Sequence, residues 1–163
     1  MKKSLILLAI GLIAVFAGYT LWFSKTPAPA VSFTTLQGQK MDLASLKGKV
    51  VLVNFWATSC SGCVQEMPQM KQMYQQFAPA GFTIVAVAMN YDPSNYVQAY
   101  AQKNQLPFLV TMDSQGAIAK AFGDIQLTPS TFLIDRDGHI VKRYVGVMNF
   151  NEVRQLIEQG TRA

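Results

Sequence analysis

Two cysteines, Cys60 and Cys63, are the side chains best suited to redox chemistry in this chain, and two residues separate them. No other cysteine occurs among the 163 residues. The pair follows an apolar run over residues 50–56 and precedes a segment with helical spacing over residues 61–77. A strand that turns into a helix through Cys-x-x-Cys is typical of redox-active dithiols. The spacing therefore predicts thiol–disulfide exchange.

The predicted start of the helix assigns a role to each cysteine. Free backbone amides and the positive end of the helix dipole stabilise a thiolate at Cys60 and lower the pKa of its thiol. We expect the Cys60 thiolate to attack a substrate disulfide and Cys63, one turn further on, to resolve the mixed disulfide. The redox group is then the cysteine pair itself, so we expect no metal and no organic cofactor.

Other uses of the cysteine pair fit the sequence less well. A structural disulfide across so short a loop would constrain the unfolded chain little. A structural zinc site needs four ligands, and the chain holds two cysteines and one histidine, His139. A copper carrier would need a third ligand, and His139 follows an Asp-Gly turn that is typical of a surface. A non-catalytic metal carrier or binding module stays as an alternative function.

The first 23 residues form a segment of their own. Lys2 and Lys3 precede 19 uncharged residues, 5–23. As a helix these residues span about 28 Å, which is enough for the hydrocarbon core of a membrane. This length favours a transmembrane anchor over a cleaved signal peptide, although Ala28-Pro29-Ala30 offers the small-x-small pattern of a peptidase site. Under both interpretations the two lysines stay in the cytoplasm and the rest of the chain lies outside, where disulfides persist.

Residues 24–30 are expected to form an extended, proline-containing linker, and residues 31–163 a single domain. Strands alternate with helices in this domain before a strand pair and a helix end it, which predicts an α/β fold with a mixed sheet and helices on both faces. Ser94 is the expected cap of the second long helix. We expect strands over residues 50–55, 83–89, 108–112, 131–134 and 139–147, and helices over residues 61–77, 94–103, 115–122 and 151–158.

The charge of the chain gives no sign of a nucleic-acid partner. From Ser24 onward, the sequence contains 12 Lys and Arg residues and 9 Asp and Glu residues, and the small basic excess is scattered along it. No basic stripe alternates with aromatic residues, as nucleic-acid binding would require.

Two segments of the sequence carry a family resemblance. Phe55-Trp56-Ala57-Thr58-Ser59-Cys60-Ser61-Gly62-Cys63, followed by Glu66-Met67-Pro68, is the first, and Thr128-Pro129-Ser130-Thr131-Phe132 is the second. With both, residues 31–160 resemble the membrane-anchored thioredoxin-like proteins of the TlpA/ResA type. The resemblance implies a thioredoxin-like fold with an added hairpin near Phe33 and a central insertion around residues 94–112.

The resemblance also implies roles for residues outside the dithiol. Pro129 would be a cis-proline packed beside the cysteines, and Thr128 would offer its backbone to an extended substrate strand. Trp56 is assigned to the substrate-binding region with them. Asp92 follows the second buried strand, where some relatives have an acid near the site.

A carboxylate near the resolving thiol is a further implication of the resemblance. Glu66 comes three residues after Cys63 and therefore lies on the same side of the predicted helix. A carboxylate at this place would raise the pKa of Cys63 and could relay its proton.

Two residues depart from the pattern of related proteins. Ser59 stands where relatives usually have tryptophan, and Asn54 stands where thioredoxin has an acid, so any acid role falls elsewhere.

The resemblance implies an extracytoplasmic disulfide reductase that a membrane electron donor returns to the dithiol state. Its expected substrates are disulfide-containing proteins, such as apocytochrome c or other oxidised envelope proteins. A thiol peroxidase is the alternative enzyme. Resembling peroxidases hold their reactive cysteine in a Pro-x-x-x-Thr-x-x-Cys setting, and no proline precedes Cys60 in its loop.

Overall fold

The computed structural model describes residues 26–162. The predicted anchor over residues 1–23 lies outside this range. Within residues 26–162, no helix combines the length and the apolar character that a membrane crossing needs.

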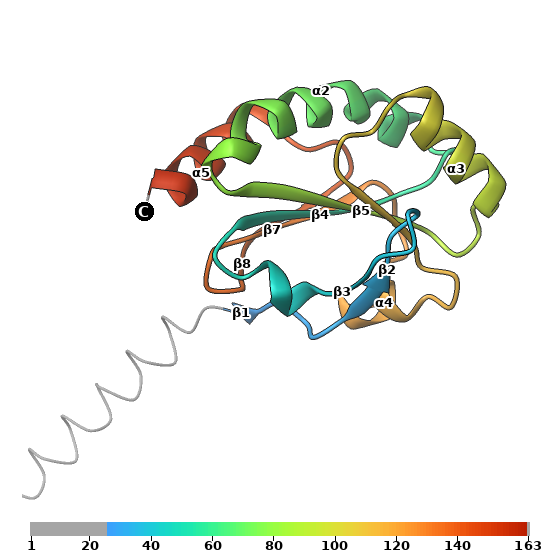
Figure 1. The fold of residues 1–163 in the computed structure, drawn as a ribbon, viewed down its shortest axis with the longest axis horizontal. Helices are drawn as coiled ribbons and strands as arrows, with labels where there is room; N and C mark the ends of the chain where they lie inside the picture. The colour runs from blue at the N-terminus through green and yellow to red at the C-terminus, as the bar shows by residue number, and fades with distance from the viewer. Residues whose placement is uncertain (1–25, 163) are drawn as a thin grey trace, which may run out of the picture.

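A six-stranded mixed sheet forms the centre of the molecule, with strand order β1-β8-β7-β4-β5-β6 (Figure 1). β4, β5 and β6 run parallel, whereas β7, β8 and β1 add antiparallel pairs. A separate hairpin of β2 and β3 lies beside this sheet. The strands are β1 (Thr26–Pro27), β2 (Ser32–Thr34), β3 (Lys40–Asp42), β4 (Val50–Trp56), β5 (Phe82–Ala88), β6 (Leu109–Met112), β7 (Ser130–Ile134) and β8 (His139–Val145).

Helices cover both faces of the sheet, which confirms the predicted thioredoxin-like α/β fold (Figure 1). One face carries α2, α3 and α5, and the other carries the β2–β3 hairpin, the turn η1 and α4. The helices are η1 (Leu43–Leu46), α2 (Ser61–Phe77), η2 (Ala78–Ala80), α3 (Ser94–Lys103), α4 (Ala117–Ala121) and α5 (Phe150–Arg162).

β4 is the strand that leads into the dithiol, and all seven of its residues are buried. Its side chains alternate between two cores, because successive residues of a strand point to opposite faces. Val50, Leu52 and Trp56 pack on the α2 side, and Phe55 packs on the α4 side. The predicted strand with two buried faces is therefore confirmed, and Cys60 follows its carboxyl end.

Three details differ from the sequence-based expectations. Part of the predicted linker is folded, since Thr26 pairs with Ile140 and gives the outer edge of β8 a partner. Ser94 does not cap α3, because Pro93 takes the N-cap position and no side chain makes a capping bond there. α4 is confined to Ala117–Ala121, which is shorter than the pattern predicted.

Candidate active site

Cys60 and Cys63 form a disulfide at the N-terminus of α2, with their Cα atoms 5.3 Å apart. Cys60 is the N-cap residue of this helix, in extended conformation, and its Sγ accepts a hydrogen bond from the Cys63 amide at 3.2 Å. Sγ therefore occupies the place where a capping oxygen would bind the first free amides of a helix. In the dithiol state the same amide and the helix dipole stabilise a Cys60 thiolate.

The two cysteines differ in exposure. Cys60 is partly exposed, whereas Cys63 is 1 % exposed and packs in the core with Met67. A disulfide in another protein can therefore reach the Cys60 sulfur but not the Cys63 sulfur. This asymmetry favours Cys60 as the attacking thiol; the order of attack stays a prediction.

A cis peptide bond joins Thr128 to Pro129, as predicted. Pro129 lies beside the start of α2, since a Cβ atom on Gly62 would lie 3.6 Å from Pro129 Cδ and 3.3 Å from Val147 Cγ2. The Pro129 carbonyl accepts a hydrogen bond from the Gly146 amide at 2.8 Å. Gly62 thus allows the dithiol turn to approach the cis-proline loop closely, and a larger residue would push Val147 aside.

Glu66 is buried on α2 one turn after Cys63, with 1 % of its surface exposed. Its Oε1 accepts a hydrogen bond from the Met148 amide at 2.6 Å, and its Oε2 has no hydrogen-bond partner among the described residues. Burial raises the pKa of the Glu66 carboxyl to about 7, although the bond from Met148 acts in the opposite direction. The carboxyl can therefore take up and release a proton near neutral pH.

Asp92 lies in the loop after β5 and binds the loop that carries the dithiol. It is 3 % exposed, and its two carboxylate oxygens accept hydrogen bonds from the amide and the hydroxyl of Thr58, each at 2.6 Å. Its neighbour Tyr91 shares a hydrogen bond with Thr128 at 3.2 Å. The loop after β5 therefore touches both the turn before Cys60 and the residue before the cis-proline.

Trp56 and Asn54 support the site from the interior. Trp56 is 0 % exposed and its ring packs on Tyr100 at a centroid distance of 5.3 Å. We therefore correct the prediction of a substrate contact at Trp56, because it offers no surface to a substrate. Asn54 is buried where thioredoxin carries an acid, and it donates a hydrogen bond to Thr131 across the β4–β7 pair.

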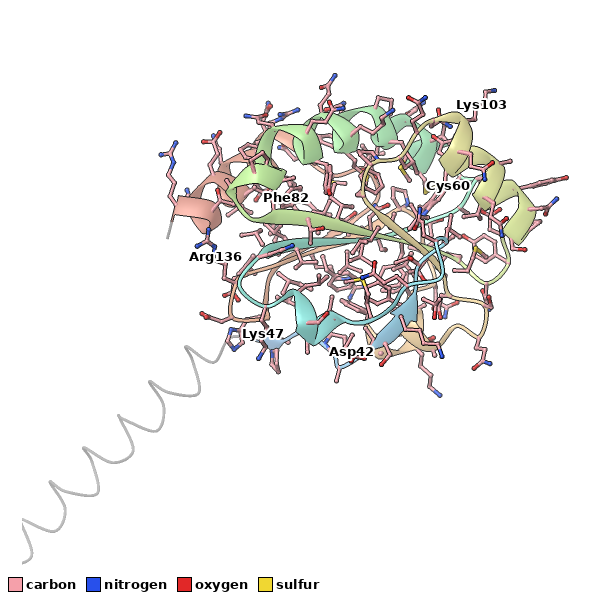
Figure 2. All side chains as sticks on the ribbon, in the orientation of Figure 1. Asp42, Lys47, Cys60, Phe82, Lys103 and Arg136 are labelled. Atoms are coloured by element: carbon pink, nitrogen blue, oxygen red, sulfur yellow. A yellow bond between two sulfur atoms is a disulfide. The ribbon has the colours of Figure 1, made fainter. Side chains whose placement is uncertain are left out.

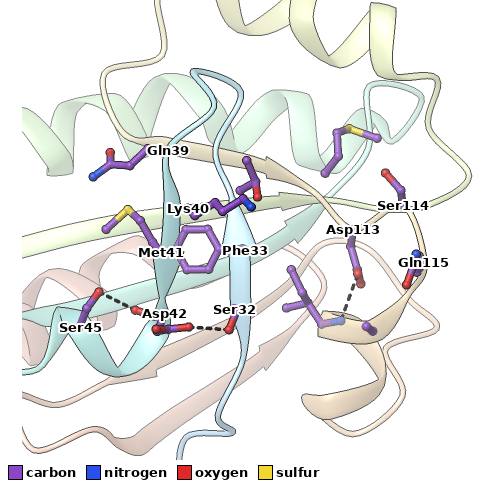
Figure 3. Close-up of a pocket in the computed structure, with 14 residues that line it drawn as sticks. Ser32, Phe33, Gln39, Lys40, Met41, Asp42, Ser45, Asp113, Ser114 and Gln115 are labelled. Atoms are coloured by element: carbon purple, nitrogen blue, oxygen red, sulfur yellow. Dashed lines mark hydrogen bonds between the residues drawn. The ribbon is translucent and has the colours of Figure 1, made fainter.

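Other clefts and polar clusters of the described residues do not include the cysteines. A cavity of about 740 Å³ lies between the β2–β3 hairpin and α4 (Figure 3). Asp113 at its edge uses both carboxylate oxygens to bind the amides of Ile118 and Ala119. The ligand atoms of Asp135, Asp137 and His139 come within 4.8 Å of one another at the β7–β8 turn, and neither cysteine belongs to this group.

The fold and the dithiol agree with comparisons to known proteins. Residues 24–157 match the Redoxin family. The chain belongs to this family. Thiol-disulfide oxidoreductase ResA of Bacillus cereus is 31 % identical over 174 aligned residues, which cover 99 % of each chain. Thioredoxin-like protein YneN of Bacillus subtilis is 33 % identical, over 90 % of this chain and 94 % of YneN.

A solved structure extends the similarity to three dimensions. The thiol:disulfide interchange protein of Chlorobium tepidum TLS matches with a TM-score of 0.77 and 31 % identity, over 85 % of this chain and 97 % of that protein. The Redoxin-family membership, these relatives and the Cys60–Cys63 pair together show an enzyme of the thiol–disulfide oxidoreductase type.

Proposed function

We propose that this protein is a disulfide reductase that works outside the cytoplasm, anchored by residues 1–23. The asymmetric dithiol carries the proposal. Cys60 is accessible at the start of α2, Cys63 is buried behind it, and cis-Pro129 lies beside Gly62, between the two cysteines in the sequence. A purely structural disulfide would need neither an exposed sulfur nor a carboxyl group with a pKa of about 7 one turn away.

The reduction proceeds in two exchange steps. In the first, the Cys60 thiolate attacks a substrate disulfide, forms a mixed disulfide and releases one substrate thiolate, which takes a proton. In the second, Cys63 gives its proton to ionised Glu66 and attacks Cys60 Sγ, which releases the second substrate thiolate. This thiolate takes a proton from solvent, and Glu66 releases its own proton to solvent and is ionised again. The substrate gains two electrons and two protons, and Cys60 and Cys63 become a disulfide. A dithiol partner then returns the pair to the reduced state.

The direction, location and partners follow from the resemblance to the TlpA/ResA type. The electron donor is a membrane protein with a reactive dithiol. The substrates are oxidised envelope proteins, with the cysteines of apocytochrome c as one example. Electrons enter and leave through the cysteine pair alone, and the mechanism uses no bound metal or organic cofactor.

Apolar side chains around the dithiol form a docking surface for these substrates. Among the described residues, six large apolar side chains are exposed, and five of them belong to segments that adjoin the dithiol turn or the cis-proline loop: Tyr91, Tyr96, Leu127, Val145 and Val147. Leu127 precedes Thr128, and Val147 contacts the position of Gly62. An extended apolar segment laid beside Thr128 would cover these side chains while its disulfide meets Cys60.

Trapping of the mixed disulfide tests this function. Cys63→Ser leaves the attacking thiol but removes the resolving thiol, so it should accumulate substrate adducts that a reductant releases. Cys60→Ser should form none, because the remaining thiol is buried. Equal trapping by both variants, or by neither, would contradict the proposed roles.

The redox state in cells tests the direction. Acid quenching followed by alkylation with a mass tag should show Cys60 and Cys63 mostly reduced, because a reductase in an oxidising compartment needs a dedicated electron supply. A mostly oxidised pair would contradict the reductase direction. Rapid consumption of hydrogen peroxide by the reduced protein would instead support the peroxidase alternative.

A further inference from the structure

The loop after β5 is bonded to the loop that presents Cys60 at three points. The Met89 amide donates to the Trp56 carbonyl at 3.0 Å. The Thr58 amide donates to Asp92 Oδ2, and the Thr58 hydroxyl donates to Asp92 Oδ1, each at 2.6 Å. One carboxylate therefore fixes the backbone and the side chain of Thr58, two residues before Cys60. Hydrogen bonds to an ionised acceptor are about twice as strong as neutral ones.

Asp92 is itself held firmly. Its side chain is 3 % exposed, and its own amide donates to the Met89 carbonyl at 3.0 Å. Pro93 follows with φ at −60°, and α3 begins at the next residue. Because proline fixes its own φ and restricts the residue before it, the carboxylate projects from a segment with little freedom.

The position of Cys60 depends on the residue that Asp92 holds. The Cys60 amide donates to the Ala57 carbonyl at 3.1 Å, so residues 57–60 form a turn with Thr58 inside it. At the end of this turn, Cys60 Sγ lies 3.2 Å from the Cys63 amide nitrogen. A movement of Thr58 would displace Sγ from the amides that stabilise its thiolate.

We propose that Asp92 is a positioning residue for the dithiol, acting through Thr58 to hold Cys60 Sγ over the first amides of α2. This inference deepens the proposed function, because it concerns the thiolate on which disulfide exchange depends. The rival explanation is that Asp92 acts by its charge, since a nearby anion disfavours a thiolate. The two explanations predict different results for different variants.

Titration of the thiolate by its ultraviolet absorbance, on the reduced full-length protein, separates them. Thr58→Val removes the hydroxyl bond and keeps the charge of Asp92. We expect its Cys60 titration midpoint to rise by about one pH unit, which gives about tenfold less thiolate below the midpoint. Thr58→Ser keeps the hydroxyl and should titrate like the parent. An unchanged midpoint in Thr58→Val would overturn the proposal.

Asp92→Asn measures the contribution of charge, because the amide keeps an acceptor for the Thr58 amide. A lower midpoint in Asp92→Asn, with Thr58→Val unchanged, would support the rival explanation. Asp92→Ala removes both bonds and should raise the midpoint at least as far as Thr58→Val. Adding Thr58→Val to Asp92→Ala should have little further effect, because both changes break the same link.

Asp113→Asn is a matched control for the loss of stability. Asp113 is also buried, at 4 % exposure, and binds two backbone amides, but these belong to α4. We expect Asp113→Asn to lower the unfolding free energy without moving the Cys60 midpoint. If Asp113→Asn moved the Cys60 midpoint as far as Thr58→Val does, the shift would be a general effect of lower stability, and the proposal would be overturned. The titration needs no substrate. It therefore tests the positioning role of Asp92 even if experiments contradict the proposal that the protein acts as a reductase.

Discussion

Glu66 and Cys63 lie buried one turn apart on α2, while Cys60 is partly exposed. The second exchange step produces a thiolate from a buried thiol, and a buried charge is costly unless a nearby group takes the proton. Glu66 suits this task, because burial raises the pKa of its carboxyl to about 7 and its Oε2 has no partner among the described residues. Its Oε1 is fixed by the Met148 amide, which keeps the carboxyl in the core.

Replacing Glu66 with Gln should change how stability depends on pH. The folded carboxyl titrates at about 7 instead of 4.5, so the folded parent binds more protons than the unfolded chain between these values. The parent therefore loses stability as the pH rises from 4.5 through 7, whereas the variant does not. Between pH 4.5 and 8, the unfolding free energy of oxidised Glu66→Gln should rise relative to the parent by about 3 kcal/mol.

Denaturant unfolding of both oxidised proteins at several pH values measures this difference, because neither cysteine titrates in the disulfide. Glu158→Gln removes a partly exposed carboxylate of α5 and is the control for the general effect of a Glu→Gln change. A constant difference between Glu66→Gln and the parent would show that the carboxyl titrates at its ordinary pKa in the folded protein.

At the scale of the secondary-structure elements, α5 packs closely on the sheet at Gly160. A Cβ atom on Gly160 would lie 2.9 Å from Cγ2 of Val50, the first residue of β4, and Val50 is 2 % exposed. The glycine therefore allows the helix to pack on the strand that leads to the dithiol. Helix propensity alone would favour alanine at this position by about 1 kcal/mol.

Gly160→Ala should destabilise the protein in spite of this propensity, because the added methyl group overlaps a buried side chain that has little room to move. We expect a net loss of roughly 1–2 kcal/mol in the free energy of unfolding. Gln159→Ala changes the neighbouring exposed position of α5 and should have almost no effect. Stabilisation by Gly160→Ala would mean that the helix shifts without cost.

The sequence was sufficient for the elements that carry the chemistry. A continuous apolar run predicted β4, helical spacing predicted α2, and the paired motifs predicted the cis bond before Pro129. It was not sufficient for features that depend on contacts between distant segments. The bonds from Thr58 to Asp92 span 34 positions, and no local pattern shows that a carboxylate after β5 will reach them. The burial of Trp56 depends likewise on its contact with Tyr100 of α3.

At the scale of the whole domain, the proposed docking surface combines side chains from the loop after β5, α3, the cis-proline loop and the end of β8. Such a surface matters for a protein substrate and not for a small disulfide, which needs only the Cys60 sulfur. Leu127 and Val147 are its most exposed aliphatic members, at 65 % and 59 %. Replacing the Leu127 and Val147 side chains should therefore weaken the binding of a protein substrate without changing the rate of disulfide exchange at Cys60.

The double variant Leu127→Ser/Val147→Ser should raise KM for an oxidised protein substrate by about tenfold, through the loss of buried apolar area. Its reaction with a small aromatic disulfide should stay within twofold of the parent. Val141→Ser is the control, since Val141 is 45 % exposed and is the one large exposed apolar side chain of the described residues outside the docking surface. Equal losses toward both substrates would mean that the double change disturbs the dithiol itself.

The pairing of β1 with the first residues of β8 fixes where the N-terminal segment joins the domain. The chain enters the fold beside His139, whereas Val145, at the far end of β8, pairs with Ser130 next to the cis-proline. β8 has seven residues, so its two ends lie about 20 Å apart. β1 and Cys60 lie on opposite sides of the molecule (Figures 1 and 2). In the anchored arrangement proposed above, a tether that joins the domain at β1 would hold the Cys60 sulfur on the side away from the membrane, toward proteins in the aqueous compartment. In that arrangement the domain would have to reorient to collect electrons from a donor in the membrane, so the length of the tether would set how often the two meet.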